Sequence, residues 1–454
     1  MILSPRQQVL RILADSKLAR GKRKLAGEDQ LSRQAILDLQ TRLLLRVARR
    51  AVEKVPFYRK HFQEHGYRAE MITCLDSLKQ FPIINRDIVK QHASSFIDDD
   101  YPPERLWKGH TSGSSGPALD LYMPRFQTSI EEAYIHSQWQ RIGYKPGKTP
   151  LLSVRARPDY ITDAGRIVEY DSHRNVYNAS VFQLKQDTVA DLVQVIHDEK
   201  IEFIHTYPST AQYLASLLAG QSDLATQISS LKAFLLSSET LTPGTREQVT
   251  KIFGKRVWAH YGHAEHLILG GACEQADDYH LWPSYGLAQL VDEAGNEICG
   301  SGSIGELVGT TLTNPAMPLI RYRTGDYAEW SPGDCSCGRE WQRIRNVIGK
   351  YGTDVLYDEA GGVYNLSLIM RVIIFLKDVY PFEYLFRYQF LQEVAGEVIL
   401  MIVPKQTFTE EMEKLIKTGF EHFTENRIRI HLETVTNIPL ESSGKTKLLI
   451  QRLV

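Results

Sequence analysis

The sequence predicts an α/β protein with a large N-terminal α/β domain and a smaller α+β domain at the C-terminus. Its 454 residues are too many for one ordinary hydrophobic core, so two or three domains are expected. Short apolar segments alternate with amphipathic segments over 151–220, which is the pattern of parallel β-α units. From residue 351 onward the pattern changes to that of an independent α+β module. We therefore expect domains at 1–349 and 350–454.

Composition and charge exclude several classes of protein. The apolar and charged fractions, 43% and 24%, are those of a globular protein. The formal net charge of −1 gives no electrostatic reason to expect a nucleic-acid partner or an anionic membrane surface. The longest apolar runs, such as Val398–Val403, are far short of a membrane span.

Five cysteines and the N-terminal segment indicate the compartment. Residues 1–25 contain no sustained apolar centre, so no secretory signal is expected. Few cysteines in a long chain without such a signal favour a reducing environment over a disulfide framework. We expect a cytoplasmic protein, and the sequence leaves open whether it forms a homodimer.

Residues 1 to about 60 have a helical pattern. Five apolar residues share one face at helical spacing, and Pro56 ends the pattern. They are Leu44, Val47, Ala48, Ala51 and Val55. A packing helix is the expected role.

The β-α region places polar residues where strands end. Strands are expected at Leu151–Val154 and Ile201–His205, and helices at Thr188–His197 and Thr210–Leu218. Ligands of parallel sheets lie beyond the carboxyl ends of the strands, which would place His205–Pro208 near a substrate. These residues also suit an ordinary turn.

The next expected strand is Ala233–Leu236, and Ser237, Ser238 and Glu239 follow it. The same argument places these three side chains at the ligand end of the sheet. Their order also suits a helix cap.

A loop rich in glycine and hydroxyl residues precedes a short strand, Leu119–Met123. It consists of Thr111, Ser112, Gly113, Ser114, Ser115 and Gly116. Exposed backbone amides and hydroxyl donors together suit phosphate oxygens, although small-residue turns are common. The Gly-Lys-Ser/Thr ending of a Walker A loop is absent from this sequence.

Four soft or borderline metal ligands occur as two local pairs. Cys273 and His280 are separated by six residues, and Cys335 and Cys337 form a C-S-C-G sequence. Two such pairs brought together by the fold would make a tetrahedral Zn²⁺ site without an open position for catalysis. The alternative is buried free thiols, which we also expect for Cys74 and Cys299.

Four further motifs follow the Gly/Ser loop in order. They are Y-G-H-A-E (Tyr261–Glu265), Y-R-T-G-D (Tyr322–Asp326), Gly349-Lys350 and P-L-E-S-S-G-K (Pro439–Lys445). This series resembles the adenylate-forming superfamily of acyl-CoA synthetases, and within it the phenylacetate–CoA ligase branch with its capsule-biosynthesis relatives. The resemblance runs from Val55 to Lys445, and the C-x-C-G-R sequence resembles a zinc-holding element of part of that branch. It implies a large multi-sheet N-terminal domain and a small mobile C-terminal domain.

The resemblance implies roles for individual residues. Thr111 would act in catalysis within the phosphate loop, Glu265 would bind Mg²⁺, Asp326 would accept the ribose hydroxyls, and Lys445 would be the catalytic lysine. The nucleotide-binding residues would be Thr111, Ser112, Gly113, Ser114, Ser115, Gly116, Ser238, Glu239, Tyr261, Asp326 and Lys350. The substrate-binding residues would be Tyr207, Ser237, Gly262 and His263.

The C-terminal domain would carry Lys445 on a loop after a strand. Its expected elements are a helix at Leu366–Leu376, a hairpin of Tyr384–Leu391 and Glu397–Val403, a helix at Thr409–Phe423 and a strand at Arg429–Val435. Asp354 is the hinge candidate, and Lys447 is a neighbouring lysine that the motif does not select.

The implied activity is ATP-dependent activation of an aromatic or small carboxylic acid through an acyl-adenylate, followed by transfer to CoA. Two departures stand out. Pro117 follows Gly116 where the family usually has lysine, and Lys350 replaces the family's arginine. The sequence leaves open transfer to an amine or a carrier-protein thiol, and a non-catalytic nucleotide-binding protein.

Overall fold

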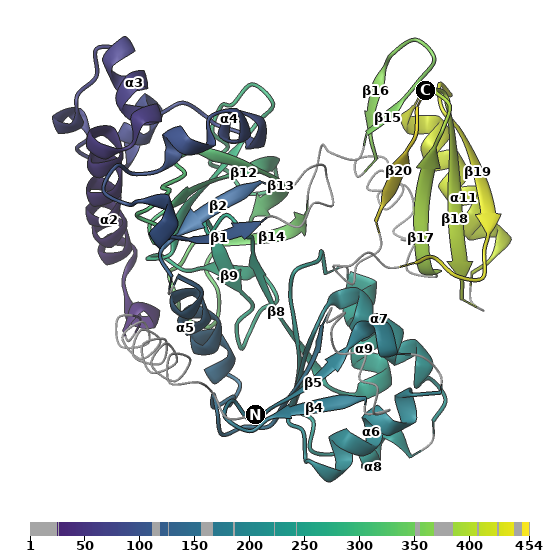
Figure 1. Cartoon of the computed structure of the whole chain (residues 1–454). Coiled ribbons are helices and arrows are strands. Elements are labelled where there is room, and N and C mark those ends of the chain that lie inside the picture. The colour runs from purple at the N-terminus through teal and green to yellow at the C-terminus, as the bar shows by residue number, and fades with distance from the viewer. Residues whose placement is uncertain are drawn as a thin grey trace. The chain divides into compact units, whose positions relative to one another are not determined.

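The structure is a computed structural model, and it describes most of the chain (Figure 1). The described residues are 25, 27–110, 119–125, 127–155, 167–184, 187–221, 223–241, 243–349, 355–366, 385–405, 408–424, 426–439 and 447–453. Two compact units divide the chain. The first comprises 1–113, 117–146 and 258–347, and the second comprises 114–116, 147–257 and 348–454. The expected domain boundary at residue 349 stays a prediction.

Helices of the first unit begin with α2, Arg33–Lys54, whose N-cap Ser32 accepts a hydrogen bond from the Ala35 amide. The predicted apolar face is buried, and the helix ends before Pro56 as expected. Pro56 also begins the next helix, α3 (Pro56–Glu64), because its missing N–H is not needed in a first turn. This unit also contains the short helix α4, Arg86–Gln91, and the longer helix α5, Gln127–Gln140.

The sheet of the first unit brings the motif residues together. Its strands are β8 (Arg256–Gly262), β9 (Leu269–Gly271), β10 (Tyr279–Leu281), β11 (Gly286–Val291), β12 (Ile304–Thr311), β13 (Tyr322–Trp330) and β14 (Arg343–Ile348). Their order is β11-β12-β13-β14-β10-β9-β8. The sequence predicts a strand at Arg256–His260 that ends in Tyr261 and Gly262, but β8 continues through both residues, which pair with β9. A separate antiparallel pair is formed by β1 (Trp107–His110) and β2 (Asp120–Met123).

The second unit contains the predicted β-α units. Its strands are β3 (Leu151–Arg155), β4 (Val168–Asp171), β5 (Val176–Ser180), β6 (Phe203–Thr206) and β7 (Ala233–Leu236), in the order β7-β6-β3-β5-β4. Its helices are α6 (Val189–Asp198), α7 (Pro208–Leu217), α8 (Leu224–Gln227) and α9 (Pro243–Phe253). β3 pairs in parallel with β5 and β6, and β6 with β7, which confirms the predicted parallel arrangement.

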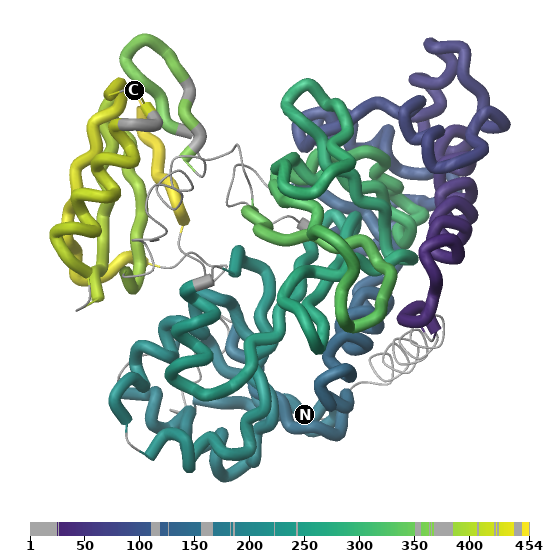
Figure 2. Tube along the Cα trace, turned by 180° about the vertical axis from the view of Figure 1, so that it is seen from behind, coloured from purple at the N-terminus to yellow at the C-terminus, as the bar shows by residue number. Residues whose placement is uncertain are grey.

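The C-terminal part has its own sheet and hydrophobic core. Its trace is coloured from green to yellow in Figure 2. Its elements are β15 (Val355–Tyr357), β16 (Val363–Asn365), β17 (Leu385–Gln392), β18 (Glu397–Pro404), α11 (Glu410–Phe423), β19 (Arg429–Thr434) and β20 (Leu449–Gln451). The four-stranded order is β19-β18-β17-β20, and the predicted hairpin is present with Gly396 at φ 81°. Phe420 of α11 stacks on Phe390 of β17, which covers one face of the sheet. The helix predicted at Leu366–Leu376 lies, beyond its first residue, outside the described residues.

Membrane insertion finds no support in the helices. Within the described part of the chain, no helix combines the length and the apolar content needed to cross a membrane.

Candidate functional site

Two motifs of the first unit meet at a buried hydrogen bond. The Tyr261 hydroxyl, at the end of β8, donates to Oδ2 of Asp326 on β13 at 2.7 Å. The backbone N–H of Asp326 donates to Thr324 Oγ1 at 3.1 Å, and Gly325 has φ 76°, so the turn before the carboxylate is sharply defined. Burial, followed by the Asp326 charge, raises the pKa of Tyr261, which therefore stays a hydrogen-bond donor at neutral pH.

A buried ion pair that sequence reasoning missed supports the same turn. Arg323 Nη1 lies 2.5 Å from Glu306 Oε2, and the Gly325 amide donates to Glu306 Oε1 at 3.2 Å. A buried carboxylate of this kind is costly unless it is paired. The signal in the sequence was a single charged residue, Glu306, inside the otherwise uncharged strand 304–311, which predicts a buried partner.

His263 is a half-buried histidine in the turn after β8, and both of its ring nitrogens are shielded from solvent. Neither of its ring nitrogens has a hydrogen-bond partner among the described residues. Burial lowers its pKa to about 4, partly opposed by the Asp326 charge, so the ring is neutral at pH 7. Shielded ring nitrogens that lack a partner among the described residues suit contact with a polar ligand.

Glu265 and its neighbour His266 are held by separate groups. The Tyr322 hydroxyl approaches Glu265 Oε1 at 3.5 Å. His266 has φ 54°, and its Nδ1 lies 3.0 Å from the Tyr285 hydroxyl and 3.3 Å from Glu131 Oε2. These buried contacts hold the left-handed backbone directly after Glu265, consistent with a structural role for His266.

If Asp326 accepts the ribose hydroxyls of ATP, as the resemblance implies, replacing Tyr261 with phenylalanine is expected to weaken ATP binding about fivefold to tenfold, because Asp326 would lose the donor that orients it. The KM for ATP in pyrophosphate exchange measures the effect, and the KM for the acid should stay unchanged. Tyr170→Phe, at an exposed tyrosine of the second unit, is the control. An unchanged KM for ATP in Tyr261→Phe would contradict the assigned role of the pair.

The predicted substrate residues of the second unit lie together at the carboxyl ends of its strands. Tyr207 and Ser237 are buried, and Ser238 has a left-handed backbone with φ 70°. The Ser237 and Ser238 hydroxyl oxygens are 3.4 Å apart. Arg155, at the end of β3, donates to both serines and was not predicted from the sequence.

Glu239 has a structural contact that the sequence did not indicate. Its carboxylate accepts hydrogen bonds from the Ser209 amide at 2.9 Å and the Ser209 hydroxyl at 3.1 Å. Glu239 thus caps α7, whose own N-cap residue offers no side-chain bond. The sequence left open that Ser237, Ser238 and Glu239 cap a helix. Glu239 does cap one, but that helix lies earlier in the chain.

Several predicted site residues lie outside the described residues. These are Thr111, Ser112, Gly113, Ser114, Ser115, Gly116, Lys350 and Lys445, together with the hinge candidate Asp354. Their roles stay predictions. Gly349, directly before Lys350, is described, and its amide donates to Thr240 Oγ1 at 3.0 Å.

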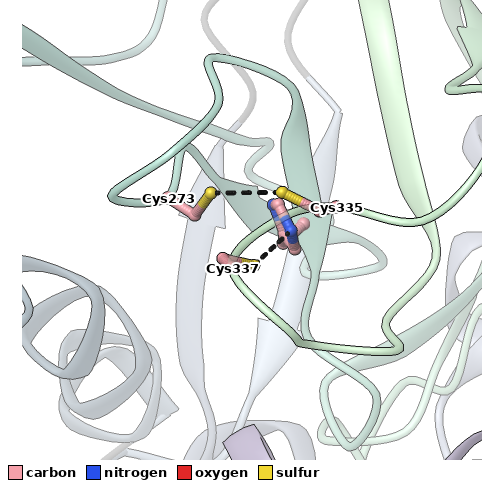
Figure 3. A group of neighbouring side chains, drawn as sticks. Cys273, Cys335 and Cys337 are labelled. Carbon is pink, nitrogen blue, oxygen red and sulfur yellow. Dashed lines mark hydrogen bonds between the residues drawn. The ribbon is translucent and has the colours of Figure 1, made fainter.

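The four predicted zinc ligands converge in the first unit (Figure 3). The ligand atoms of Cys273, His280, Cys335 and Cys337 all lie within 4.8 Å of one another. Cys273 Sγ and Cys335 Sγ are 3.7 Å apart, and Cys337 Sγ is 3.3 Å from His280 Nε2. Ligands at about 2.0–2.3 Å from Zn²⁺ in a tetrahedron would be separated by similar distances.

The surroundings of this cluster also fit a metal. The amides of Gln275 and Ala276 donate to Cys273 Sγ, and His280 Nδ1 lies 3.3 Å from the Asp278 carbonyl, which suits an Nδ1–H that leaves Nε2 for the ion. Burial raises the pKa of Cys273 to about 11 and lowers that of His280 to about 4. A divalent cation would supply the charge that favours thiolate.

The two remaining cysteines differ from the expectation. Cys74 and Cys299 are free thiols as predicted, but both are exposed, so the prediction that they are buried was wrong. Cys74 stands at the start of a 3-10 helix, where its amide donates to Ser77 Oγ, and the apolar pattern around it gave no indication of that surface position.

Two family models match the chain. The model of the AMP-binding enzymes matches residues 178–311, and the model of the CapK C-terminal domain matches residues 367–452. The first range contains Tyr207, Ser237 and the Tyr261–Glu265 motif, and the second contains Lys445. The chain belongs to the adenylate-forming superfamily.

Curated relatives define the branch. The chain is 26% identical to the phenylacetate-coenzyme A ligase of Thermus thermophilus over 357 residues, or 78% of each protein. It is 26% identical to the phenylacetate-coenzyme A ligase of Escherichia coli K12, covering 67% of this chain and 70% of that protein. It is 20% identical to Protein CapK of Staphylococcus aureus, covering 87% of this chain and 85% of that protein. Within the superfamily, the chain falls in the phenylacetate–CoA ligase and CapK branch.

A solved structure shares the fold. A 2-hydroxyisobutyryl-CoA ligase in complex with R3-HIB-AMP superposes with a TM-score of 0.65 at 18% identity, covering 94% of this chain and 91% of that one. The predicted fold class, a large α/β part with a multi-stranded sheet and a smaller C-terminal domain, is confirmed.

Proposed function

We propose that this protein activates a carboxylic acid with ATP to form an acyl-adenylate and pyrophosphate, and then transfers the acyl group to coenzyme A. The buried Tyr261–Asp326 hydrogen bond is the observation that carries the proposal. It holds the Asp326 carboxylate, which the resemblance matches to the family's ribose-binding aspartate, and both ring nitrogens of His263 lack a hydrogen-bond partner among the described residues. The branch relatives that are named phenylacetate-coenzyme A ligases support the same reaction.

The first half-reaction is an in-line attack by a carboxylate oxygen on the α-phosphorus. The acid is already ionised at neutral pH, so no general base is required. The chain's task is to position two anions and to offset their charge. In this proposal Asp326 accepts the ribose hydroxyls, the loop Thr111–Gly116 donates to the phosphates, and Lys445 contacts the carboxylate and the α-phosphate.

Two metals fit the residues present. Glu265 would hold Mg²⁺, which neutralises charge on the departing pyrophosphate. Cys273, His280, Cys335 and Cys337 would hold Zn²⁺, and because all four positions come from the chain, its role would be structural. We place the reaction in the cytoplasm, which supplies both ATP and coenzyme A.

ATP–pyrophosphate exchange with a panel of aryl, aliphatic, hydroxy and amino acids tests the adenylation step. We expect exchange with one class of acid, and formation of its CoA thioester and AMP when coenzyme A is added. Exchange without any CoA product, together with acylation of an added amine or carrier protein, would mean that this molecule and not coenzyme A is the acceptor. ATP binding without exchange for any acid would contradict the proposed reaction.

A further inference from the structure

A closed network of three polar side chains adjoins the turn that carries Glu265. Glu131 comes from α5, His266 from the turn, and Tyr285 from the position directly before β11. The Tyr285 hydroxyl donates to Glu131 Oε1 at 3.0 Å. His266 Nδ1 lies 3.0 Å from that hydroxyl and 3.3 Å from Glu131 Oε2. Because the hydroxyl proton is used on Glu131, the Nδ1–H of His266 is the donor in both of its contacts, and each member is held by the other two.

The backbone on both sides of Glu265 is fixed. The His266 amide donates to the His263 carbonyl at 3.1 Å, which closes a turn with Glu265 as its third residue. His266 has φ 54°, a conformation that is unfavourable for a residue with a Cβ atom and persists when its surroundings hold it. Its ring is buried within the network. The contacts of His266 therefore set the backbone from which the Glu265 side chain extends.

The segment after His266 leaves this turn little room to move. Leu267 and Ile268 are buried. A Cβ atom on Gly286 would overlap the Leu267 carbonyl oxygen, and one on Gly309 would come within 2.6 Å of Leu267 Cβ. The two glycines thus let neighbouring backbone close around the segment. These contacts already bury the turn, so the polar network adds direction to it rather than burial.

The helix α5 also holds the other end of the β8–β9 hairpin. Gln138 is buried and lies two helical turns after Glu131, on the same face. Its Nε2 donates to the Ala259 carbonyl in β8 at 2.9 Å and to the Ala272 carbonyl after β9 at 3.2 Å. Gly271 permits this approach, because a Cβ atom there would overlap the Gln138 amide. The hairpin is therefore aligned by one helix at both of its ends.

A partly buried acid is a costly way to support a turn. Removing a carboxylate from water is unfavourable unless its oxygens are hydrogen-bonded. A glycine at position 266 would adopt the same backbone at little cost, and apolar side chains would fill the space. Hydrogen bonds are directional, so this network selects one geometry of the turn. A carboxylate that binds a metal ion needs such a geometry, since outer contacts of this kind change metal affinity or activity by about 10- to 100-fold.

We propose that Glu131 is a positioning residue for Glu265. Acting through Tyr285 and His266, it fixes the turn so that the Glu265 carboxylate is placed to hold Mg²⁺ at the bound nucleotide. The inference rests on the proposed function, in which Glu265 would be the Mg²⁺ ligand. It adds a layer of residues that act on the metal only through the backbone of that ligand.

The effect of Mg²⁺ on ATP binding tests this role without any turnover. Titration calorimetry with ATP gives one dissociation constant in EDTA and one in saturating Mg²⁺, and the ratio of the first to the second reports the contribution of the metal. Glu131→Gln keeps the size of the side chain and removes its charge. We expect the ratio to fall about 10-fold, while the dissociation constant in EDTA stays within about twofold of the parent's.

Two tyrosines of one aromatic pair provide a matched comparison. The rings of Tyr134 and Tyr285 meet edge to face at 5.1 Å, and both are buried. Tyr285→Phe removes the hydroxyl of the network and should lower the ratio as Glu131→Gln does. The Tyr134 hydroxyl pairs instead with Ser284 Oγ at 2.9 Å, so Tyr134→Phe should keep the parent's ratio. An unchanged binding stoichiometry shows for each variant that the protein is folded.

Glu265→Gln distinguishes failure of this inference from failure of the proposed function. Loss of the Mg²⁺ effect in Glu265→Gln, with the parent's ratio in Glu131→Gln, would overturn the positioning role and leave the proposed reaction standing. An equal fall in the two tyrosine variants would also overturn it, because general packing would then explain the effect. A lower ratio in every variant except Tyr134→Phe, without exchange for any acid, would support the network and contradict the reaction.

Discussion

Replacing Cys335 and Cys337 together with serine should release one zinc ion per chain and lower the melting temperature by about 10 °C. The two cysteines lie in the loop before β14, whereas Cys273 and His280 flank the turn between β9 and β10. A metal that joins these segments closes a loop of more than fifty residues, so its loss should cost on the order of 3–5 kcal/mol. About 2–4 °C per kcal/mol converts this cost into the expected shift.

Metal analysis of the purified protein and differential scanning calorimetry measure the two effects. Cys74→Ser combined with Cys299→Ser is a matched control, because it also removes two thiols, and these are exposed and outside the cluster. The control should keep its zinc and its melting temperature. A parent protein purified with metal in the growth medium that holds no zinc would contradict the assignment, and the cluster would then be a group of free thiols.

Elements with a strong local pattern could be predicted from the sequence. β7 was predicted with its observed bounds because its four residues form a continuous apolar run, all of them buried. The helices α6 and α11 were predicted to within a residue because their apolar residues recur at helical spacing. The cluster of Cys273, His280, Cys335 and Cys337 was predictable for a related reason. Each pair is local in sequence, and only the meeting of the pairs depended on the fold.

Contacts between distant segments could not be predicted in this way. Glu239 caps a helix that begins about thirty residues earlier, and no spacing rule connects it to Ser209. Arg155 follows four buried strand residues and has no motif, so its contacts with Ser237 and Ser238 depend on the lateral order of β3, β6 and β7. A side chain that acts across neighbouring strands becomes visible only when the strand order is known.

The strand bounds also changed the interpretation of one motif. Tyr261 and Gly262 were expected to follow the strand, but they pair with β9, and Gly262 lies opposite Leu269. A Cβ atom on Gly262 would approach the Leu269 side chain to 2.9 Å. Close packing within the sheet is therefore one reason for this glycine, beside the approach of an acyl group that the resemblance implies.

Lys445→Ala should reduce pyrophosphate exchange by about 100- to 1,000-fold, while thioester formation from a synthetic acyl-AMP stays within about threefold. The lysine is proposed to offset charge between the carboxylate and the α-phosphate, and that charge accumulates only while the adenylate forms. The exchange rate and the rate of CoA thioester formation from the preformed adenylate are measured separately on the same preparation.

Lys447→Ala is a control that separates the effect of the position of Lys445 from the effect of losing one positive charge in this segment. Both variants lose one lysine from the same short segment, but the Lys447 backbone carbonyl accepts a hydrogen bond from Gln389 Nε2 at 2.8 Å, which ties that residue to β17. Its neighbour Leu448 is tied to β17 as well, through the Phe390 amide. Lys447→Ala should therefore keep nearly full exchange. Normal exchange in Lys445→Ala would contradict the assignment of this lysine. An equal loss in both variants would mean that general positive charge, and not one placed cation, serves the reaction.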